Sequence, residues 1–345
     1  MESTVPLTTP VLLLTFNRPD LTRQVLGAIR EARPTRLFVA SDGPREHVES
    51  DVQKVSATRA LIDEMIDWPC KVERRYSRSN QGCRVGVSSA ITWFFDHVEE
   101  GIILEDDCLP HPDFFPYCTE LLSRYRHDAR VMSISGENSV GAIPEEESVS
   151  YSFVREPSIW GWATWRSAWA LYDANLESWR TLRENRSEKQ ALWPDPVERN
   201  WWTKTLDDLL IKGTPNSWAY RWMFSVMLND GVSVLPAVNL VSNVGFRSDA
   251  THTLPAIRGK RHVRQAVPTM SLLPLSHPAN LQRNASAELL LFDFAHGGHA
   301  LRSPARRLVR RFKALVPRRV KVVIQALLER NGTQASSVPK DSAIH

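Results

Sequence analysis

The sequence predicts an α/β protein with a Rossmann-like, mostly parallel sheet flanked by helices, and three observations support this fold class. Short apolar runs alternate with segments of helical spacing over roughly the first 130 residues, which is the pattern of a doubly wound sheet. The apolar runs are continuous, as in strands that are buried on both faces. The composition, with 42% hydrophobic and 24% charged residues, is that of a globular protein.

The first strand is expected at residues 11–15, which form an apolar run. Pro19 suits the first turn of a helix, and Leu21 and Val25 follow it at helical spacing. The remaining elements of this half alternate in the same way. We expect strands at residues 37–40, 71–76, 101–104 and 131–134, and helices at residues 46–66, 85–98 and 112–125.

Polar residues follow three of the expected strands. Arg18 comes just after the first strand, and Asp42 follows the second within a Ser-Asp-Gly-Pro turn. An acidic triplet, Glu105-Asp106-Asp107, ends the fourth. Ligands of doubly wound sheets bind beyond the carboxyl ends of the strands. The sequence therefore predicts a ligand site where these residues meet.

The acidic triplet has a cost that a cation would offset. Adjacent carboxylates repel one another by roughly 1 kcal/mol at 4 Å even in water. Mg²⁺ and Mn²⁺ prefer oxygen ligands, and either ion would also stabilise negative charge on a diphosphate leaving group. Because side chains alternate along a strand, we expect Glu105 and Asp107 on one side and Asp106 on the other. The alternative interpretation is a solvated acidic loop.

The second half of the chain has a different character. Ten of the twelve tryptophans lie between Trp160 and Trp222, among few β runs. We therefore expect helices and loops that pack on the edge of the sheet. Aromatic faces bind the C–H surfaces of sugars. Trp160, Trp162, Trp165 and Trp218 are thus expected to contribute to a sugar platform, with core packing as the alternative.

Other features concern the location of the protein. The sequence has no apolar stretch near the ~18–20 residues needed to span a bilayer. Acidic Glu2 stands where a signal peptide needs positive charge. Cys70, Cys83, Cys108 and Cys118 have neither CxxC nor zinc-finger spacing, so reduced thiols are expected. These features predict a cytoplasmic protein.

Basic charge is concentrated near the C-terminus. Residues 302–321 contain nine Lys or Arg and no acid, which leaves 34 basic and 39 acidic residues elsewhere. Leu308, Phe312 and Leu315 lie on one side of a helix and the basic residues on the other. This pattern predicts a C-terminal amphipathic helix in peripheral contact with an anionic membrane, with docking on the core as the alternative. No nucleic-acid partner is expected, because no recognised module accompanies the segment.

Several segments together resemble GT-A-fold glycosyltransferases, and bacterial family-2-like enzymes most closely. The triplet and the Pro-Asp-Phe-Phe stretch after it are also similar to the animal N-acetylglucosaminyltransferase that initiates complex N-glycans. The resemblance covers roughly residues 10–253. The segments are residues 10–18 (PVLLLTFNR), 41–44 (SDGP), 105–110 (EDDCLP), 112–115 (PDFF), 159–165 (IWGWATW), 239–246 (NLVSNVGF) and 249–253 (DATHT).

The resemblance implies roles for particular residues. Asp107 would bind Mn²⁺ or Mg²⁺ directly, and His252 would reach the metal or the diphosphate from the far side. A UDP-sugar is the nucleotide sugar that we expect first. Asp42 would hydrogen-bond the nucleobase, and the other residues that would hold the nucleotide sugar are Arg18, Asn80, Gly82, Glu105 and Asp106.

The identity of the general base is a separate question. An inverting transfer needs a base to take the acceptor proton, and in the relatives it is commonly an Asp that follows a tryptophan. Ala219 stands at that position here, and alanine accepts no proton. Asp207, Asp208 and Asp230 are the nearby candidates, each with a surface or turn role as the alternative.

We therefore expect a metal-dependent glycosyltransferase that acts on a glycan or a lipid-linked acceptor. Inversion is favoured by the resemblance, with a retaining mechanism as the alternative. A catalytically silent GT-A scaffold that binds nucleotide sugar or glycan is the alternative. A nucleotidyltransferase is disfavoured, because the segment after the first strand is not Gly-rich. The expected divisions are a nucleotide-sugar half at 8–150, an acceptor-side half of the same domain at 151–254, a linker at 255–285, a basic helical tail at 286–332 and a disordered end at 333–345.

Overall fold

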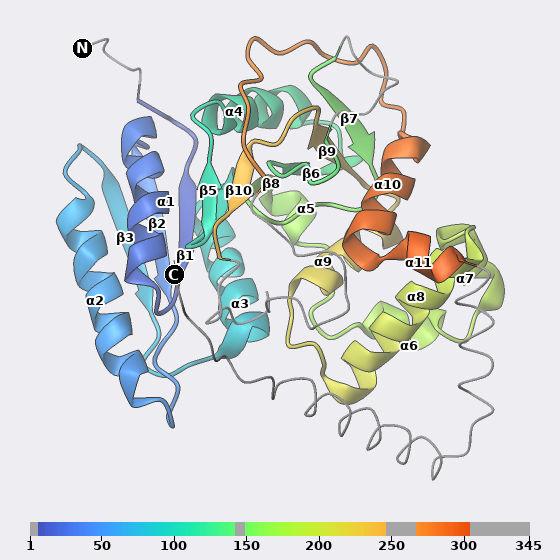
Figure 1. Ribbon diagram of the computed structural model, residues 1–345, viewed down its shortest axis with the longest axis horizontal. Coiled ribbons are helices and arrows are strands. Elements are labelled where there is room, and N and C mark those ends of the chain that lie inside the picture. The colour runs from blue at the N-terminus through green and yellow to red at the C-terminus, as the bar shows by residue number, and fades with distance from the viewer. Residues whose placement is uncertain (1–5, 142–148, 246–266, 304–345) are drawn as a thin grey trace, which may run out of the picture.

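The computed structural model describes residues 6–141, 149–245 and 267–303, and its centre is an eight-stranded sheet (Figure 1). The strand order is β3-β2-β1-β4-β8-β6-β9-β7. Strands β8 and β7 run antiparallel to their neighbours, and the other six share one direction. The predicted α/β class with a mostly parallel sheet is confirmed. The strands are β1 Val11–Thr15, β2 Arg36–Ser41, β3 Lys71–Tyr76, β4 Glu100–Glu105, β6 Val131–Ser135, β7 Tyr151–Val154, β8 Trp162–Trp165 and β9 Val232–Pro236.

Helices cover both faces of the sheet, because the strands are apolar on both. Val11 and Leu13 of β1 pack with α1, α2 and α4. Leu12 and Leu14 point to the opposite face, where they pack with α3, α5 and α9. Each of these buried side chains contributes roughly 1.5–3 kcal/mol. The helices are α1 Pro19–Ala32, α2 Glu49–Met65, α3 Gly82–His97, α4 Phe114–Tyr125, α5 Arg166–Trp169 and α9 Ala219–Leu228.

The second half of the chain is not confined to the edge of the sheet, which corrects the expectation from the sequence. β8 is inserted between β4 and β6, and β9 and β7 complete the far side. The sequence pattern did not reveal β7 and β8 because each has only four residues, too few for a period to show. A separate core around Trp179, Trp193 and Trp202 joins α9 to three further helices, α6 Glu177–Leu182, α7 Arg186–Leu192 and α8 Pro196–Asp207.

A short antiparallel ribbon lies next to the acidic triplet. It consists of β5 (Cys108–Pro110) and β10 (Val241–Asn243). The register places Asn243 opposite Cys108. The ribbon therefore brings a segment of the second half of the chain beside the end of β4.

The C-terminal part of the described chain packs on the far edge of the sheet. Residues 267–284 form neither a helix nor a named strand. The helices α10 (Ala285–His296) and α11 (Gly298–Arg302) follow. Ala287 and Leu291 of α10 pack with apolar residues of β7 and β9.

The predicted elements of the first half agree with the structure. The bounds of β1 and β3 are those predicted, and β2, β4 and β6 differ by one residue at most at each end. The helices α2, α3 and α4 differ by up to three residues at their beginnings. β5 was not predicted, because its three residues follow the triplet directly.

Several predictions concern residues outside the described part. These include His252, the domain limits beyond Ser303 and nearly all of the basic segment 302–321. The four cysteines are free thiols. Across residues 6–141, 149–245 and 267–303, no helix combines the length and the apolar character that a membrane span requires.

Candidate functional site

A cavity of about 340 Å³ opens at the carboxyl ends of β1, β2 and β4. The N-terminal ends of α3 and α9 complete its wall, so both halves of the chain contribute to it. The volume lies in the range of small-molecule sites, and the position is where doubly wound sheets bind ligands. The structure thus brings together the residues predicted from the first half, which are Arg18, Asp42, Asn80, Gly82, Glu105, Asp106 and Asp107.

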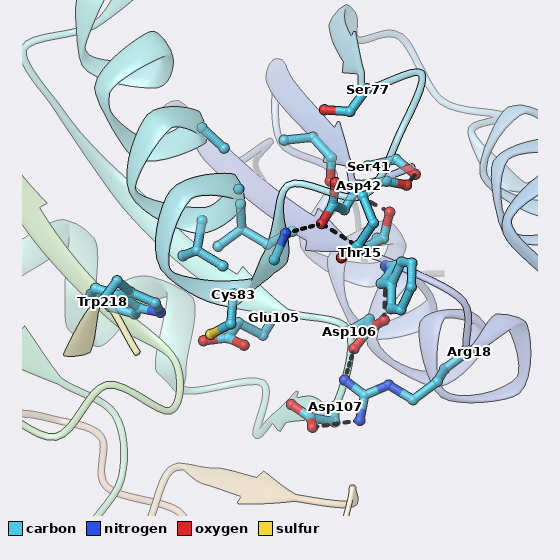
Figure 2. A pocket seen from close by; sticks show the side chains of 18 of the residues that line it. Thr15, Arg18, Ser41, Asp42, Ser77, Cys83, Glu105, Asp106, Asp107 and Trp218 are labelled. Atoms are coloured by element: carbon cyan, nitrogen blue, oxygen red, sulfur yellow. Dashed lines mark hydrogen bonds and ion pairs between the residues drawn. The ribbon is translucent and has the colours of Figure 1, made fainter. Parts of the chain in front are cut away.

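Arg18 bridges two carboxylates of the acidic triplet (Figure 2). Its Nη1 donates to Asp107 Oδ2 at 2.9 Å, and its Nη2 donates to Asp106 Oδ1. Asp106 Oδ2 also accepts the backbone N–H of Phe16, at 3.2 Å. Asp106 and Asp107 are only 2% and 8% exposed. Arg18 therefore offsets much of the repulsion that the sequence suggested a cation must balance.

The side chains of the triplet do not alternate as expected. β4 ends at Glu105, and Asp106 and Asp107 form a turn before β5. Both aspartates therefore reach Arg18. Glu105 lies on another side of the cavity, beside Cys83 and toward Trp218 (Figure 2).

Glu105 is the carboxylate of the triplet that the described part of the chain leaves without a hydrogen bond. Burial raises the pKa of Glu105 to about 8, and the negative charges of Asp107 and Asp106 add to this effect. Burial also raises the pKa of Asp106 to about 6, although Arg18 opposes the shift. Burial raises the pKa of the Cys83 thiol to about 12, so this thiol is neutral at pH 7.

These shifts predict how stability depends on pH. A carboxyl whose pKa is raised by folding contributes stability below its unfolded pKa of about 4.3, and this contribution is lost as the pH rises through the folded pKa. For Glu105 the window therefore extends from about pH 4 to about pH 8. We expect Glu105→Gln to be more stable than the wild type by about 1–3 kcal/mol at pH 8 and equally stable near pH 4.

Urea unfolding at several pH values, in the presence of EDTA, measures this difference. Glu64→Gln is a matched control, because Glu64 is exposed on α2. An identical pH dependence in the wild type and in Glu105→Gln would contradict the prediction.

Asp42 joins two loops at the rim of the cavity. Its Oδ1 accepts the backbone N–H groups of Gly43 at 2.8 Å and Gln81 at 2.9 Å. Its Oδ2 accepts Asn80 Nδ2 at 3.0 Å and the N–H of Gly82 at 3.1 Å. A carboxylate has about four lone-pair sites, so these four donors fill its capacity. The predicted bond from Asp42 to a nucleobase would displace one of them, and the structure shows Asp42 fixing the loop at the start of α3.

The first residue of α3 must be glycine. Gly82 has a φ of +75°, and a Cβ there would lie 2.8 Å from Asn216 Nδ2. Asn216 belongs to the segment that precedes α9. Close contact between these two residues therefore joins the two halves of the chain at the cavity wall.

The four tryptophans predicted as a sugar platform have different surroundings. Trp160 borders the cavity and is partly exposed. Trp218 also borders it, although only 1% of the residue is exposed. Trp162 stacks on Trp218 with ring centroids 5.6 Å apart, and Trp165 is equally a core residue. Both belong to the central strand β8, so core packing describes them, and Trp160 and Trp218 are the two of the four that border the cavity.

The three candidate base residues, Asp207, Asp208 and Asp230, do not border the cavity. Asp208 forms ion pairs with Lys204 and Lys212, whose hydrogen bonds lower the pKa of its carboxyl. Asp230 precedes β9, which runs in the same direction as β4. Asp230 therefore lies at the amino-terminal end of the parallel strands, away from the cavity at their carboxyl ends. Ala219, the residue at the position expected for the base, does border the cavity.

A divalent cation is the group that the acidic triplet implies. Within the described ranges, no three His, Cys, Asp or Glu side chains form a metal-binding group. Mg²⁺ in nucleotide sites is commonly held by one or two carboxylates together with substrate phosphates and waters. Asp107, which borders the cavity, can supply one such carboxylate. The residues thus fit a cation that arrives with a nucleotide.

Some cavity residues were missed by the sequence analysis. Cys83, Arg75 and Asn216 border the cavity, but no motif marks them. Asn243 also borders it, and a signal for it was present. It lies within residues 239–246, one of the segments that carried the resemblance, but its contact with the triplet depends on the pairing of β10 with β5.

Comparisons with known proteins give structural neighbours alone. No family model and no curated protein matches the chain. A mannosyltransferase of Pyrobaculum calidifontis, solved with GDP-Man and Mn²⁺, is 13% identical over 66% of this chain and 75% of its own, with a TM-score of 0.33. A cytidylyltransferase of Leptospira borgpetersenii is 8% identical over 54% of this chain and 74% of its own, with a TM-score of 0.31. Mouse xyloside xylosyltransferase 1 is 12% identical over 64% of this chain and 81% of its own, with a TM-score of 0.30. Similarities this weak carry no argument about function.

Proposed function

We propose that this protein is a glycosyltransferase that transfers a sugar from a nucleotide sugar to a glycan or lipid-linked acceptor, with inversion at the anomeric carbon. One observation carries the proposal. The acidic triplet, Arg18 and the start of α3 meet in one cavity at the carboxyl edge of parallel strands. Such a cavity suits a ligand that combines a nucleoside, a diphosphate and a sugar. The motifs that resemble GT-A enzymes support the same class.

The residues of the cavity have separable tasks in this proposal. Arg18 fixes the Asp107 carboxylate through Nη1. Asp42 fixes the loop before α3. Asp42 accepts the first N–H of this helix, from Gly82, so phosphate oxygens would bind the N–H groups that follow it in the first turn. Glu105, beside Cys83, offers acceptor oxygens to sugar hydroxyls.

A metal ion has one place in this arrangement. Mn²⁺ or Mg²⁺ held by Asp107 and the phosphates would stabilise negative charge on the diphosphate leaving group. UDP-sugars are the donors that we propose first. The cytoplasmic location and the contact of residues 302–321 with an anionic membrane stay predictions from the sequence.

A catalytically silent scaffold is the second candidate, and one observation favours it. Ala219 stands at the start of α9 and borders the cavity, at the position where the resemblance to GT-A enzymes implies an acid. The acids that border the cavity in the described chain are Asp42 and the triplet, and all of them belong to the first half. Transfer or slow hydrolysis of a bound sugar nucleotide distinguishes an enzyme from a scaffold.

The central test is metal-dependent binding. We expect calorimetry to show that the full-length chain binds UDP or a UDP-sugar at least about tenfold more tightly with Mn²⁺ than with EDTA. Asp107→Asn should remove this difference, because it removes the charged oxygen that faces the cation. GDP and dTDP and their sugars complete the screen. Asp67→Asn, at an exposed acid, is the control for charge.

Two results would count against the proposal. If neither EDTA nor Asp107→Asn changes the affinity for the nucleotide, the proposed metal site is wrong. An absence of binding to every nucleotide and nucleotide sugar of the screen would overturn the proposed function.

A further inference from the structure

Asn243 is a buried amide at the wall of the cavity. It is only 3% exposed, and it borders the cavity together with the acidic triplet. It reaches this place because β10 pairs with β5 directly after the triplet, with Asn243 opposite Cys108. The backbone N–H of Val244 also donates to Asp107 O at 2.8 Å.

The orientation of the Asn243 amide follows from its own turn. Its Oδ1 accepts the backbone N–H of Gly245 at 2.8 Å, an Asx turn. Gly245 in turn packs on Asp107, because a Cβ at residue 245 would lie 2.3 Å from Asp107 Oδ2. The oxygen of the Asn243 amide is therefore committed to the turn, and Nδ2 is the end that can bind another group.

Nδ2 of Asn243 has no acceptor among the described residues. Other buried asparagines nearby differ in this respect. Asn239 Nδ2 donates to Val267 O at 2.9 Å, and Asn138 Nδ2 donates to Pro236 O at 2.8 Å. A donor on a residue of the cavity wall, with no acceptor among the described residues, is available to a ligand that carries an acceptor atom.

The neighbouring carboxylates do not serve as that acceptor. Both oxygens of Asp106 are engaged by Arg18 and Phe16. Asp107 Oδ2 accepts from Arg18, and Glu105 faces Cys83. We infer that Asn243 is a substrate-binding residue whose Nδ2 donates to an oxygen of the bound nucleotide sugar, either of the diphosphate or of the sugar. This inference rests on the proposed function and adds a residue to its site.

The test compares the wild type with Asn243→Ser. A serine hydroxyl can accept the Gly245 N–H in the same type of turn, so the ribbon is retained while Nδ2 is lost. We expect the affinity for UDP-glucose with Mn²⁺, measured by calorimetry on the full-length chain, to fall about 5- to 50-fold. The melting temperature should change little. Asn239→Ser is the matched control, because it breaks bonds within the protein and should lower the melting temperature without changing the affinity.

UDP and UDP-glucose distinguish the two oxygen sources. An equal loss of affinity for both ligands indicates a phosphate oxygen, and a loss for UDP-glucose alone indicates a sugar oxygen. Both results support the inference. Wild-type affinity of Asn243→Ser for both ligands would overturn it and leave the proposed function standing. A wild type that binds none of the nucleotide sugars of the screen overturns both.

Discussion

Replacement of Arg18 by methionine is expected to destabilise the protein by about 3–5 kcal/mol at pH 7, because it leaves two buried carboxylates without their counter-ion. Asp106 and Asp107 are almost fully buried, and Arg18 is the cation that pairs with both. Methionine keeps much of the length and the apolar contacts of the arginine stem. The effect therefore reports the lost charge, and urea unfolding measures it.

Two conditions should reduce the loss of stability in Arg18→Met. At pH 4–5 the unpaired carboxylates of the variant bind protons, so the difference from the wild type should shrink. Mn²⁺ should also stabilise Arg18→Met more than the wild type, because a cation can replace the guanidinium between the two acids.

The control for Arg18→Met is Arg30→Met. Arg30 pairs with Asp67 on the surface, where both side chains are about half exposed, and such pairs contribute at most about 1 kcal/mol. Equal effects of the two substitutions would show that burial of the Arg18 pair has no energetic consequence.

Gly43→Ala is expected to destabilise the protein by about 3–4 kcal/mol, because a methyl group at this position meets backbone atoms rather than the end of a flexible side chain. A Cβ on Gly43 would lie 2.5 Å from the backbone N and C of Ser79 and 2.7 Å from the C of Arg78. The loops after β2 and β3 must then separate. Their separation would break the bonds from Asp42 to Gln81, and the wall of the cavity with them.

Thermal and urea unfolding measure the stability of Gly43→Ala, and nucleotide binding measures the state of its cavity. Gly27→Ala is the matched control. Gly27 lies within α1 and has no atom within 4 Å of an added Cβ, so alanine should stabilise this helix by about 0.5–1 kcal/mol. A neutral or stabilising effect at Gly43 would show that the two loops do not need their close contact.

The first half of the fold could be predicted because its signals are local. A strand that is buried on both faces is largely apolar, and β1 shows this in four consecutive residues, Val11 to Leu14. Turn residues mark the ends of such strands, as at Asp42. The second half lacked these signals. β7 and β8 have only four residues each. β8 lies in the centre of the sheet, but four residues are too few to show the apolar run of a buried strand.

The composition of the site could be predicted better than its contacts. Because the carboxyl ends of parallel strands lie at the same end of the sheet, the order of elements alone placed Arg18, Asp42 and the acidic triplet near one another. The bond from Arg18 to Asp107 joins residues that are 89 positions apart, and no local pattern encodes such a pair. Asn243 was missed for the same reason, because it reaches the triplet only through the pairing of β10 with β5.

The sequence by itself determined the fold class and the edge of the sheet where the polar residues gather, because burial and turn formation act on neighbouring residues. Only the tertiary structure decided which of these polar groups remain available to a ligand. Arg18 engages Asp106 and Asp107, and four donors engage Asp42. Glu105 and Asn243 Nδ2 are left without a partner in the described chain, on residues that border the cavity. Each polar group has a limited hydrogen-bond capacity, and the groups that fill it come from distant elements.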